Sequence, residues 1–149
     1  MTLPGRIVGL DVGDVRIGVA VSDPLGSMAL PREVIQRRDM ESDIAAIRAI
    51  LEETGAIRIV AGVPLDQNGQ PGPQAEKTLA FAERLREALT GIEVVTQDER
   101  YSTASAQRTL IGAGVSRKGR KKSVDMLAAQ HILQTYMDRQ SRAAGPAHD

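Results

Sequence analysis

The chain has 149 residues, a formal net charge of zero and 42% apolar residues, which is the size and composition of one folded domain with its own core. It contains no cysteine and only two histidines, so disulfides and cysteine zinc sites are excluded and a histidine-rich metal centre is disfavoured. The N-terminus lacks a signal segment, and no stretch approaches the about 20 apolar residues that cross a bilayer. We therefore expect a cytoplasmic protein that does not bind a membrane.

An aspartate interrupts the first apolar run of the chain. Residues Ile7 to Val12 predict a buried strand, and Asp11 lies inside it. After Gly13 and Asp14, the run from Arg16 to Ser22 predicts the second arm of a hairpin. A buried carboxylate without a partner costs several kcal/mol. A bound metal ion would offset that cost, so Asp11 is the first candidate ligand.

A third strand and a first helix are expected next. Residues 28–35 predict the strand, which Pro31 restricts to a sheet edge or a bulge. Asp39 or Ser42 can cap a helix that runs to about Thr54, with Gly55 after its end.

Strands and helices then alternate towards the C-terminus. An apolar run over 57–63 predicts a buried strand, parallel to an earlier one because a helix precedes it. After a glycine-rich loop over 64–73, a second helix ends at Gly91, and its apolar stripe comprises Leu79, Ala82, Leu85 and Leu89. The remaining expected elements are a strand over 92–96, a helix from Ser102 to 112–114, and, after a basic loop, a last helix over 124–137. We expect His131 to pack against its neighbours in this last helix.

This order of elements predicts an α/β fold. Three antiparallel strands followed by parallel ones would form a mixed five-stranded sheet flanked by helices. We expect a single domain over residues 1–138 and a disordered tail over residues 139–149.

Three further acidic residues stand where ligands collect in α/β sheets. Asp98 and Glu99 follow the last strand at its carboxyl end, and Asp125 opens the last helix among apolar residues. A solvated loop paired with Arg100 would explain the first two, and N-capping or the helix dipole would explain Asp125. Neither explains Asp11 inside an apolar strand. Carboxylates without His or Cys predict a hard oxygen site for Mg²⁺ or Mn²⁺, and a pair of such ions can hydrolyse a phosphodiester.

Basic residues are concentrated in one segment. Residues 100–124 hold seven basic residues and no acidic one, so the rest of the chain holds 12 basic and all 19 acidic residues. Such a segment can bind the phosphates of a nucleic acid, helped by hydroxyl groups at a helix N-terminus. The candidate phosphate-binding residues are Arg16, Arg100, Ser102, Thr103, Arg117, Lys118, Arg120, Lys121 and Lys122.

Aromatic residues make up only 2% of the chain. Phe81, Tyr101 and Tyr136 offer almost no platform on which unpaired bases could stack. Recognition should therefore rest on backbone and shape, which favours a duplex, a junction or a structured RNA.

Four motifs, in this order, resemble the YqgF family, also called RuvX. They cover roughly residues 5–137 and are Gly9-Leu10-Asp11-Val12-Gly13 with Arg16 to Asp23, Gly62-Val63-Pro64-Leu65 with Gly69, Asp98 to Thr103, and Asp125 to Leu133. The resemblance implies a ribonuclease H-like fold and a nuclease that matures the 5′ end of precursor 16S ribosomal RNA. Holliday junction resolution is the other activity that it implies.

The resemblance also implies a set of site residues. It places the acidic site on Asp11, Glu99 and Asp125, and favours Glu99 over Asp98. Many ribonuclease H-like nucleases use four carboxylates, and a fourth could come from Asp98, Asp14 or Asp66. Without a fourth carboxylate, we expect a low intrinsic rate or a need for a partner protein.

Two other functions fit parts of the pattern. A Gly-rich hairpin with an aspartate also holds ATP phosphates in actin-like and sugar kinases, but those proteins close two such domains and 149 residues hold one. A dinucleotide-binding motif is absent because Gly9, Gly13 and Gly18 are too widely spaced. The second alternative is a non-catalytic module that holds RNA among ribosome-assembly partners. The sequence is compatible with a monomer or a dimer.

Overall fold

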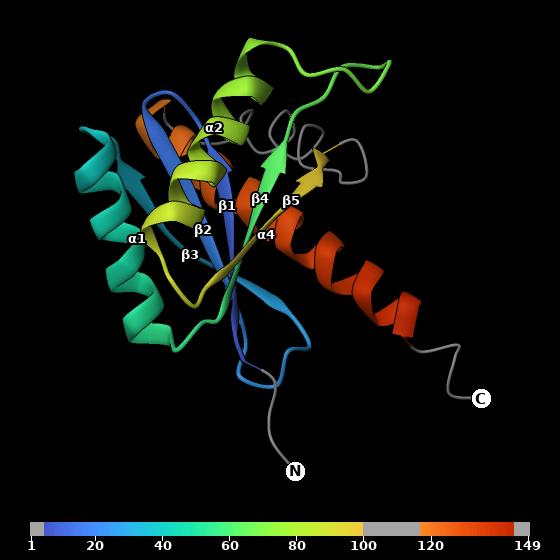
Figure 1. Ribbon diagram of the computed structural model, residues 1–149. Coiled ribbons are helices and arrows are strands. Elements are labelled where there is room, and N and C mark those ends of the chain that lie inside the picture. Colours follow the sequence, from blue (N-terminus) through green and yellow to red (C-terminus); the bar gives the residue numbers. More distant parts are fainter. Residues whose placement is uncertain (1–4, 100–116, 145–149) are drawn as a thin grey trace.

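Five strands form one sheet with helices on both faces, as seen in a computed structural model that describes residues 5–99 and 117–144 (Figure 1). The strands are β1 (Ile7–Val12), β2 (Arg16–Ser22), β3 (Ala29–Gln36), β4 (Arg58–Val63) and β5 (Glu93–Asp98), and the helices are α1 (Met40–Thr54), α2 (Pro73–Ala88) and α4 (Arg117–Ala144). The sheet order is β3-β2-β1-β4-β5. Strands β1 to β3 pair antiparallel, whereas β4 is parallel to β1 and β5 is parallel to β4. The predicted mixed sheet is confirmed.

Strand β3 lies at a sheet edge and carries a bulge. Val19 pairs with Glu33 while Ala20 pairs with Pro31, so Arg32 is the extra residue on β3. Proline has no amide hydrogen to donate to a neighbouring strand. The edge position and the bulge therefore accommodate Pro31, as the sequence predicts.

Helix α1 begins and ends at its predicted capping residues. The Asp39 carboxylate accepts hydrogen bonds from the amide of Ser42 at 2.8 Å and from its hydroxyl at 3.0 Å. Gly55 ends the helix with φ of 73°, and its amide donates to the Leu51 carbonyl at 2.8 Å. Glycine adopts this left-handed conformation readily because it has no Cβ.

Large aliphatic side chains fill the layer between the sheet and helices α1 and α2. This core includes Val8, Leu10, Val12, Ile17, Val19 and Val21 from the sheet, with Ile44, Ile47, Leu51, Phe81, Ala82 and Leu85 from the helices. The predicted burial of Leu79 is wrong, because its side chain is 39% exposed while that of Phe81 is 1% exposed. The apolar face of α2 is centred on the aromatic ring, which fills the most space.

Helix α4 covers the opposite face of the sheet and is longer than the predicted helix over 124–137. It begins at Arg117, so residues 117–122 are helical and not the predicted basic loop. It ends at Ala144, so residues 139–144 are helical and not part of a disordered tail. Apolar periodicity marks only the turns that pack on the sheet, so the polar turns at both ends escaped prediction. Residues 145–149 and the helix predicted from Ser102 lie outside the described residues. Within the described ranges, no helix combines the length and apolarity needed to span a bilayer.

Candidate functional site

Asp11 of β1 lies on the face of the sheet that α4 covers. Strand alternation puts it on the same face as Gly9, where an added methyl group would lie 2.7 Å from Cβ of Leu133 on α4. In the antiparallel ladder Asp11 pairs with Gly18. A methyl group on Gly18 would lie only 2.0 Å from the backbone carbonyl oxygen of Asp125. Glycine is therefore required here for the backbone of α4 to pass so close to Asp11.

Glu99 approaches Asp11 from the other side. The parallel register pairs Leu10 with Ala61, so the next residue of β4, Gly62, lies beside Asp11. A methyl group on Gly62 would lie 3.0 Å from Cγ of Glu99. The small residue at this position thus leaves room for the Glu99 side chain next to Asp11.

Asp125 forms an ion pair with Arg16, which is 109 residues away in the sequence. Arg16 Nε donates to Asp125 Oδ2 at 2.8 Å, and the two side chains are 24% and 21% exposed. Asp125 lies well inside α4, so it does not cap the N-terminus of that helix. Arg16, expected from sequence to bind phosphate, is engaged here with a predicted metal ligand.

The carboxylates match a divalent cation in chemical kind, because Mg²⁺ and Mn²⁺ prefer oxygen donors. Across residues 5–99 and 117–144, however, no three His, Cys, Asp or Glu side chains are grouped so that they could hold a metal ion. The guanidinium of Arg16 supplies the positive charge next to Asp125. The predicted triad of Asp11, Glu99 and Asp125 therefore stays a prediction, with its members placed around Gly18 and Gly62.

Two of the candidates for a fourth carboxylate have other partners. The Asp14 carboxylate pairs with Lys77 Nζ at 3.2 Å, and both side chains are 60% exposed. The Asp66 carboxylate accepts from the amides of Asn68 at 2.8 Å and Gln70 at 2.9 Å, which closes its own loop. Asp14 therefore forms an ion pair on the surface, and Asp66 stabilises a turn.

Asp98 lines a pocket at the edge of the sheet. This pocket has a volume of about 290 Å³ and also takes in Thr96, Arg139 and Gln140. Arg139 and Gln140 were not predicted as site residues, because they fall in the expected tail over residues 139–149. Their spacing of three and four residues from Tyr136, which lines the same pocket, is the helical signal that could have found them. Glu99, not Asp98, is the acid whose Cγ a methyl group on Gly62 would meet, at 3.0 Å.

The structure describes only part of the predicted phosphate-binding set. Residues 117–122 form the beginning of α4, which is the end of that helix nearer in sequence to Asp125. Arg100, Ser102 and Thr103 lie outside the described residues. The same holds for the side chains of Arg117, Lys118, Arg120, Lys121 and Lys122.

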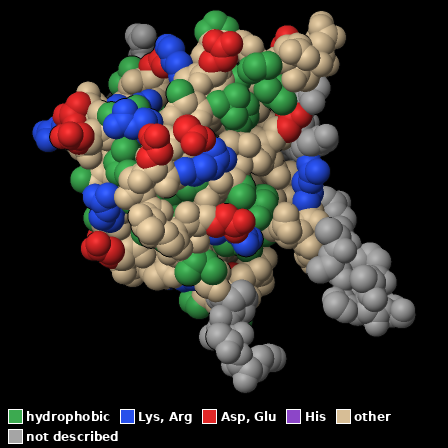
Figure 2. Space-filling view, in the orientation of Figure 1, with side chains coloured by type: hydrophobic (Ala, Val, Ile, Leu, Met, Phe, Trp, Pro, Cys, Tyr) green, Lys and Arg blue, Asp and Glu red, His purple; other side chains and the backbone are tan. Residues whose placement is uncertain are grey.

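The surface over α1 and α2 carries mixed charge. Figure 2 shows acidic and basic side chains interspersed on this side of the molecule. Ion pairs between residues of β3, α1 and α2 include Arg32 with Glu53, Arg84 with Glu87 at 3.7 Å, and Arg86 with Glu83 at 3.0 Å. A surface of alternating sign has little net field to attract a polyanion.

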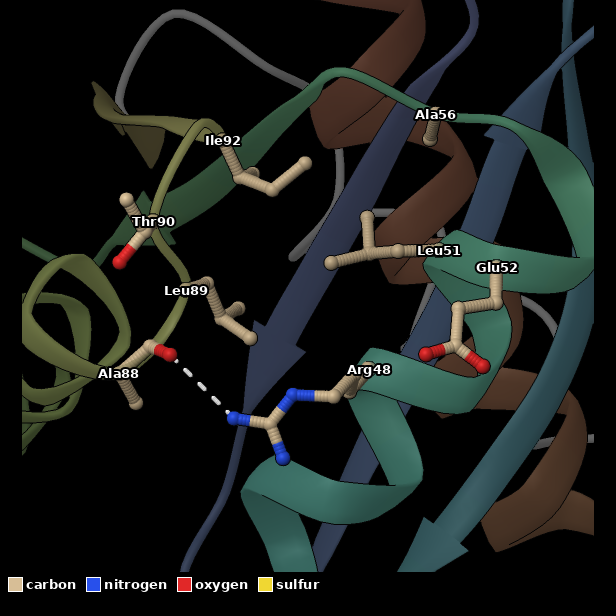
Figure 3. A pocket seen from close by; sticks show the side chains of 8 residues that line it. All are labelled: Arg48, Leu51, Glu52, Ala56, Ala88, Leu89, Thr90 and Ile92. Atoms are coloured by element: carbon tan, nitrogen blue, oxygen red, sulfur yellow. Dashed lines mark hydrogen bonds between the residues drawn. The ribbon is translucent and has the colours of Figure 1, made fainter.

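A groove of about 380 Å³ lies between the C-terminal ends of α1 and α2 (Figure 3). Leu51, Leu89 and Ile92 point into it, and Arg48 Nη2 donates to the Ala88 carbonyl at its rim at 3.2 Å. The two helices lead into β4 and β5, so the groove lies at the amino ends of these strands. The acidic residues lie at the carboxyl end of the sheet, away from this groove.

Comparison with known proteins finds matches over nearly the whole chain. The family model described as "RuvX: Holliday junction resolvase" matches residues 5–139. A relative from Clostridioides difficile (strain 630) is 52% identical over 136 residues, which are 91% of this chain and 96% of the relative. One from Symbiobacterium thermophilum is 50% identical over 141 residues, covering 95% and 96%. Both relatives carry the name "Putative pre-16S rRNA nuclease".

Solved structures share the arrangement of strands and helices. T. thermophilus RuvC in complex with a Holliday junction substrate matches with a TM-score of 0.54 and 15% identity, over 92% of this chain and 96% of that one. The yeast mitochondrial Holliday junction resolvase matches with a TM-score of 0.54 and 13% identity, over 95% and 81%. At such identities the likeness concerns the fold, and the predicted ribonuclease H-like fold is confirmed.

Proposed function

The chain belongs to the RuvX family, and we propose that it is a nuclease that hydrolyses phosphodiester bonds in the 5′-end maturation of precursor 16S ribosomal RNA. The observation that carries the proposal is the arrangement around Asp11, which Asp125 and Glu99 approach over Gly18 and Gly62. Acidic residues at the carboxyl ends of β1 and β5 and on the helix that faces them, on the same chain as a basic segment, suit the hydrolysis of a polyanion. The proposed substrate places the protein in the cytoplasm.

We assign the three carboxylates to a site for two Mg²⁺ or Mn²⁺ ions. Asp11 is the central ligand, and Glu99 and Asp125 are the flanking ones; their oxygen donors support this choice of ion. When bound, such ions activate the attacking water and stabilise the leaving oxygen. Arg16 neutralises Asp125 in its half-buried position and so limits the repulsion among the acids.

Nucleic acid is proposed to bind through its backbone. The basic beginning of α4 continues directly into the turn that carries Asp125, so a strand held there would lie close to the acids. Each basic residue that contacts a phosphate should add about one unit to the salt slope of binding. The proposed contacts are Arg16, Arg100, Ser102, Thr103, Arg117, Lys118, Arg120, Lys121 and Lys122.

A Holliday junction resolvase is the second candidate function. The description of the matching family model favours it, and the fold is shared with a resolvase solved on its junction. The scarcity of aromatic residues also suits a shaped duplex. Both candidates use the same phosphodiester hydrolysis, so they differ in substrate.

The test is cleavage of labelled precursor 16S RNA and of a four-way DNA junction, side by side, with Mg²⁺ and with Mn²⁺. Asp11→Asn should abolish cleavage and keep binding, because it removes a carboxylate and leaves the basic residues. Asp14→Asn is the matched control, because Asp14 is an exposed aspartate three positions away, paired with Lys77. Its cleavage should equal that of the wild type.

Two outcomes would contradict the proposal. Undiminished cleavage by Asp11→Asn would exclude the assigned mechanism. Binding without cleavage by the wild-type protein, together with full cellular function of Asp11→Asn, would identify a non-catalytic RNA-binding module instead.

A further inference from the structure

Side chains from outside the hairpin hold the two carbonyl groups that directly follow Asp11. Gln74, in the first turn of α2, donates through Nε2 to the Val12 carbonyl at 2.9 Å. Arg37, between β3 and α1, donates through Nη1 to the Gly13 carbonyl at 2.9 Å. We call this pair of contacts the carbonyl clamp.

The clamp lies where β4 stops pairing with β1, while β2 still pairs with β1 at Val12. The pairing of β1 with β4 runs from Ile7 to Leu10, so the carbonyls of Val12 and Gly13 lie beyond that ladder. A backbone carbonyl at a covered strand end needs a donor. The clamp supplies donors at the point where Asp11 projects from the strand.

Arg37 is itself held in place from three sides. Its Nε donates to Asp43 Oδ2 at 2.9 Å, and its guanidinium carbon lies 4.9 Å from the centre of the Phe81 ring. Asp43 is only 2% exposed, and its other oxygen accepts from the amide of Arg38 at 3.1 Å. A buried ion pair is tolerated only when its members are well bonded, and such bonding leaves it little freedom to move.

The clamped turn carries a second residue of the site. The amide of Gly13 donates to the carbonyl of Arg16 at 2.9 Å, and Arg16 Nε reaches Asp125 at 2.8 Å. A shift of the turn would therefore displace Asp11 and Arg16 together, relative to Asp125 on α4.

We propose that Gln74 and Arg37 are positioning residues of the nuclease: the carbonyl clamp holds the end of β1 so that Asp11 and Arg16 keep their places beside Asp125. The inference rests on the proposed function for its use of Asp11 in the reaction. Misplacing a catalytic group by about 1 Å can cost about a hundredfold in rate. The clamp lies on the far side of the strand end from α4, so it would act without touching the substrate.

The test is Gln74→Met, which keeps the length of the side chain and removes the donor. It should lower kcat by about tenfold or more with KM unchanged, and it should lower the melting temperature no more than Arg86→Met, which also removes a donor to a backbone carbonyl. Hydrogen exchange in the peptide covering residues 10–16 should become faster. Arg86→Met is the matched control, because Arg86 on the same helix donates to the carbonyl of Val94 at 3.0 Å at the other end of the sheet. It should change neither kcat nor exchange at residues 10–16.

A second variant probes the other contact. Arg37→Lys keeps the positive charge beside Asp43 but cannot donate to Asp43 and Gly13 together, so it should also lower kcat and speed exchange at residues 10–16. Unchanged kcat and unchanged exchange in Gln74→Met would overturn the clamp. Undiminished cleavage by Asp11→Asn would instead overturn the proposed function, and the exchange result would still decide whether the clamp holds the turn.

Discussion

The two faces of the sheet differ most at the carboxyl end of β1, although the same strands supply both and each face has an apolar core. Along β1, Val8 and Leu10 enter the aliphatic core under α1 and α2, while Gly9 and Asp11 face α4. Along β2, Ile17 is fully buried in that core and Gly18 lies against the backbone of α4. Both faces have an apolar core, which on the α4 side includes Val60, Ile132 and Leu133, but only the α4 side holds glycines beside an acid.

This difference places the candidate site on one face of the sheet, while the aliphatic core under α1 and α2 contributes to stability alone. Full burial of one large aliphatic side chain contributes about 1.5–3 kcal/mol, so the face under α1 and α2 can keep the strands in register. Glycines bury little surface, but they let a helix backbone and a carboxylate approach Asp11. The core under α1 and α2 therefore helps to offset the small amount of apolar surface that the glycines on the other face bury.

The largest effect on the cleavage rate should distinguish Glu99 from its neighbour Asp98. Glu99→Gln should lower the cleavage rate by more than about a hundredfold, because loss of the outer partner of a metal ligand already costs about 10–100-fold. Asp98→Asn should stay within a few-fold of wild type, because Asp98 lines a separate pocket with Arg139. Initial rates on labelled precursor 16S RNA give the comparison. Equal losses in both variants would contradict the assignment of Glu99.

The next effect belongs to the opposite face. Leu10→Ala should lower the free energy of unfolding by about 2–5 kcal/mol, since it opens a cavity at a fully buried position. At temperatures well below the melting temperature, the cleavage rate per folded molecule should equal that of the wild type, because Leu10 points away from the acids of the site. Urea denaturation and cleavage rates measure the two quantities. Leu25→Ala is the control, because Leu25 is 69% exposed and should contribute no comparable stability.

A smaller effect, on both stability and rate, is expected at Gly18, which lies against α4. Gly18→Ala should destabilise by about 1–3 kcal/mol and lower the rate as well, because α4 and Asp125 must move to admit the methyl group. Gly72→Ala should not lower the rate, since an added methyl group there meets no atom within 4 Å, and its cost in stability should be limited to that of alanine at the N-cap of α2. A rate loss without destabilisation at Gly18 would mean that the helix does not rest on this residue. Thermal melts and initial rates on both variants give the result.

The smallest effect concerns pH and the α1 cap. Hydrogen bonds from the amide of Ser42 and then from its hydroxyl hold the pKa of Asp39 below its usual value. Its contribution to stability is therefore complete above the ordinary aspartate pKa and is lost as the pH falls through the lowered one. Asp39→Asn keeps an acceptor but does not titrate, so its acid unfolding should depend slightly less on pH. Stability measured between neutral and acidic pH should show this difference, with the cleavage rate at neutral pH unchanged.

Local features were predictable because their causes lie within a few residues. The cap at Asp39, the helix end at Gly55 and the edge position of Pro31 follow from backbone chemistry that any fold must respect. The buried stripe of α2 was partly wrong at Leu79, because the neighbouring layers decide which side of a helix faces the core.

The sequence by itself determined that an acid interrupts the first strand and that its motifs resemble one family, since a charge within an apolar run is visible without any partner. The tertiary structure alone decided its neighbours. Strand register puts Gly18 and Gly62 on either side of Asp11, and helix packing brings Asp125 to Arg16 and Gln74 to the end of β1. These contacts join residues far apart in the chain, and only the pairing of strands and the packing of helices make such residues adjacent.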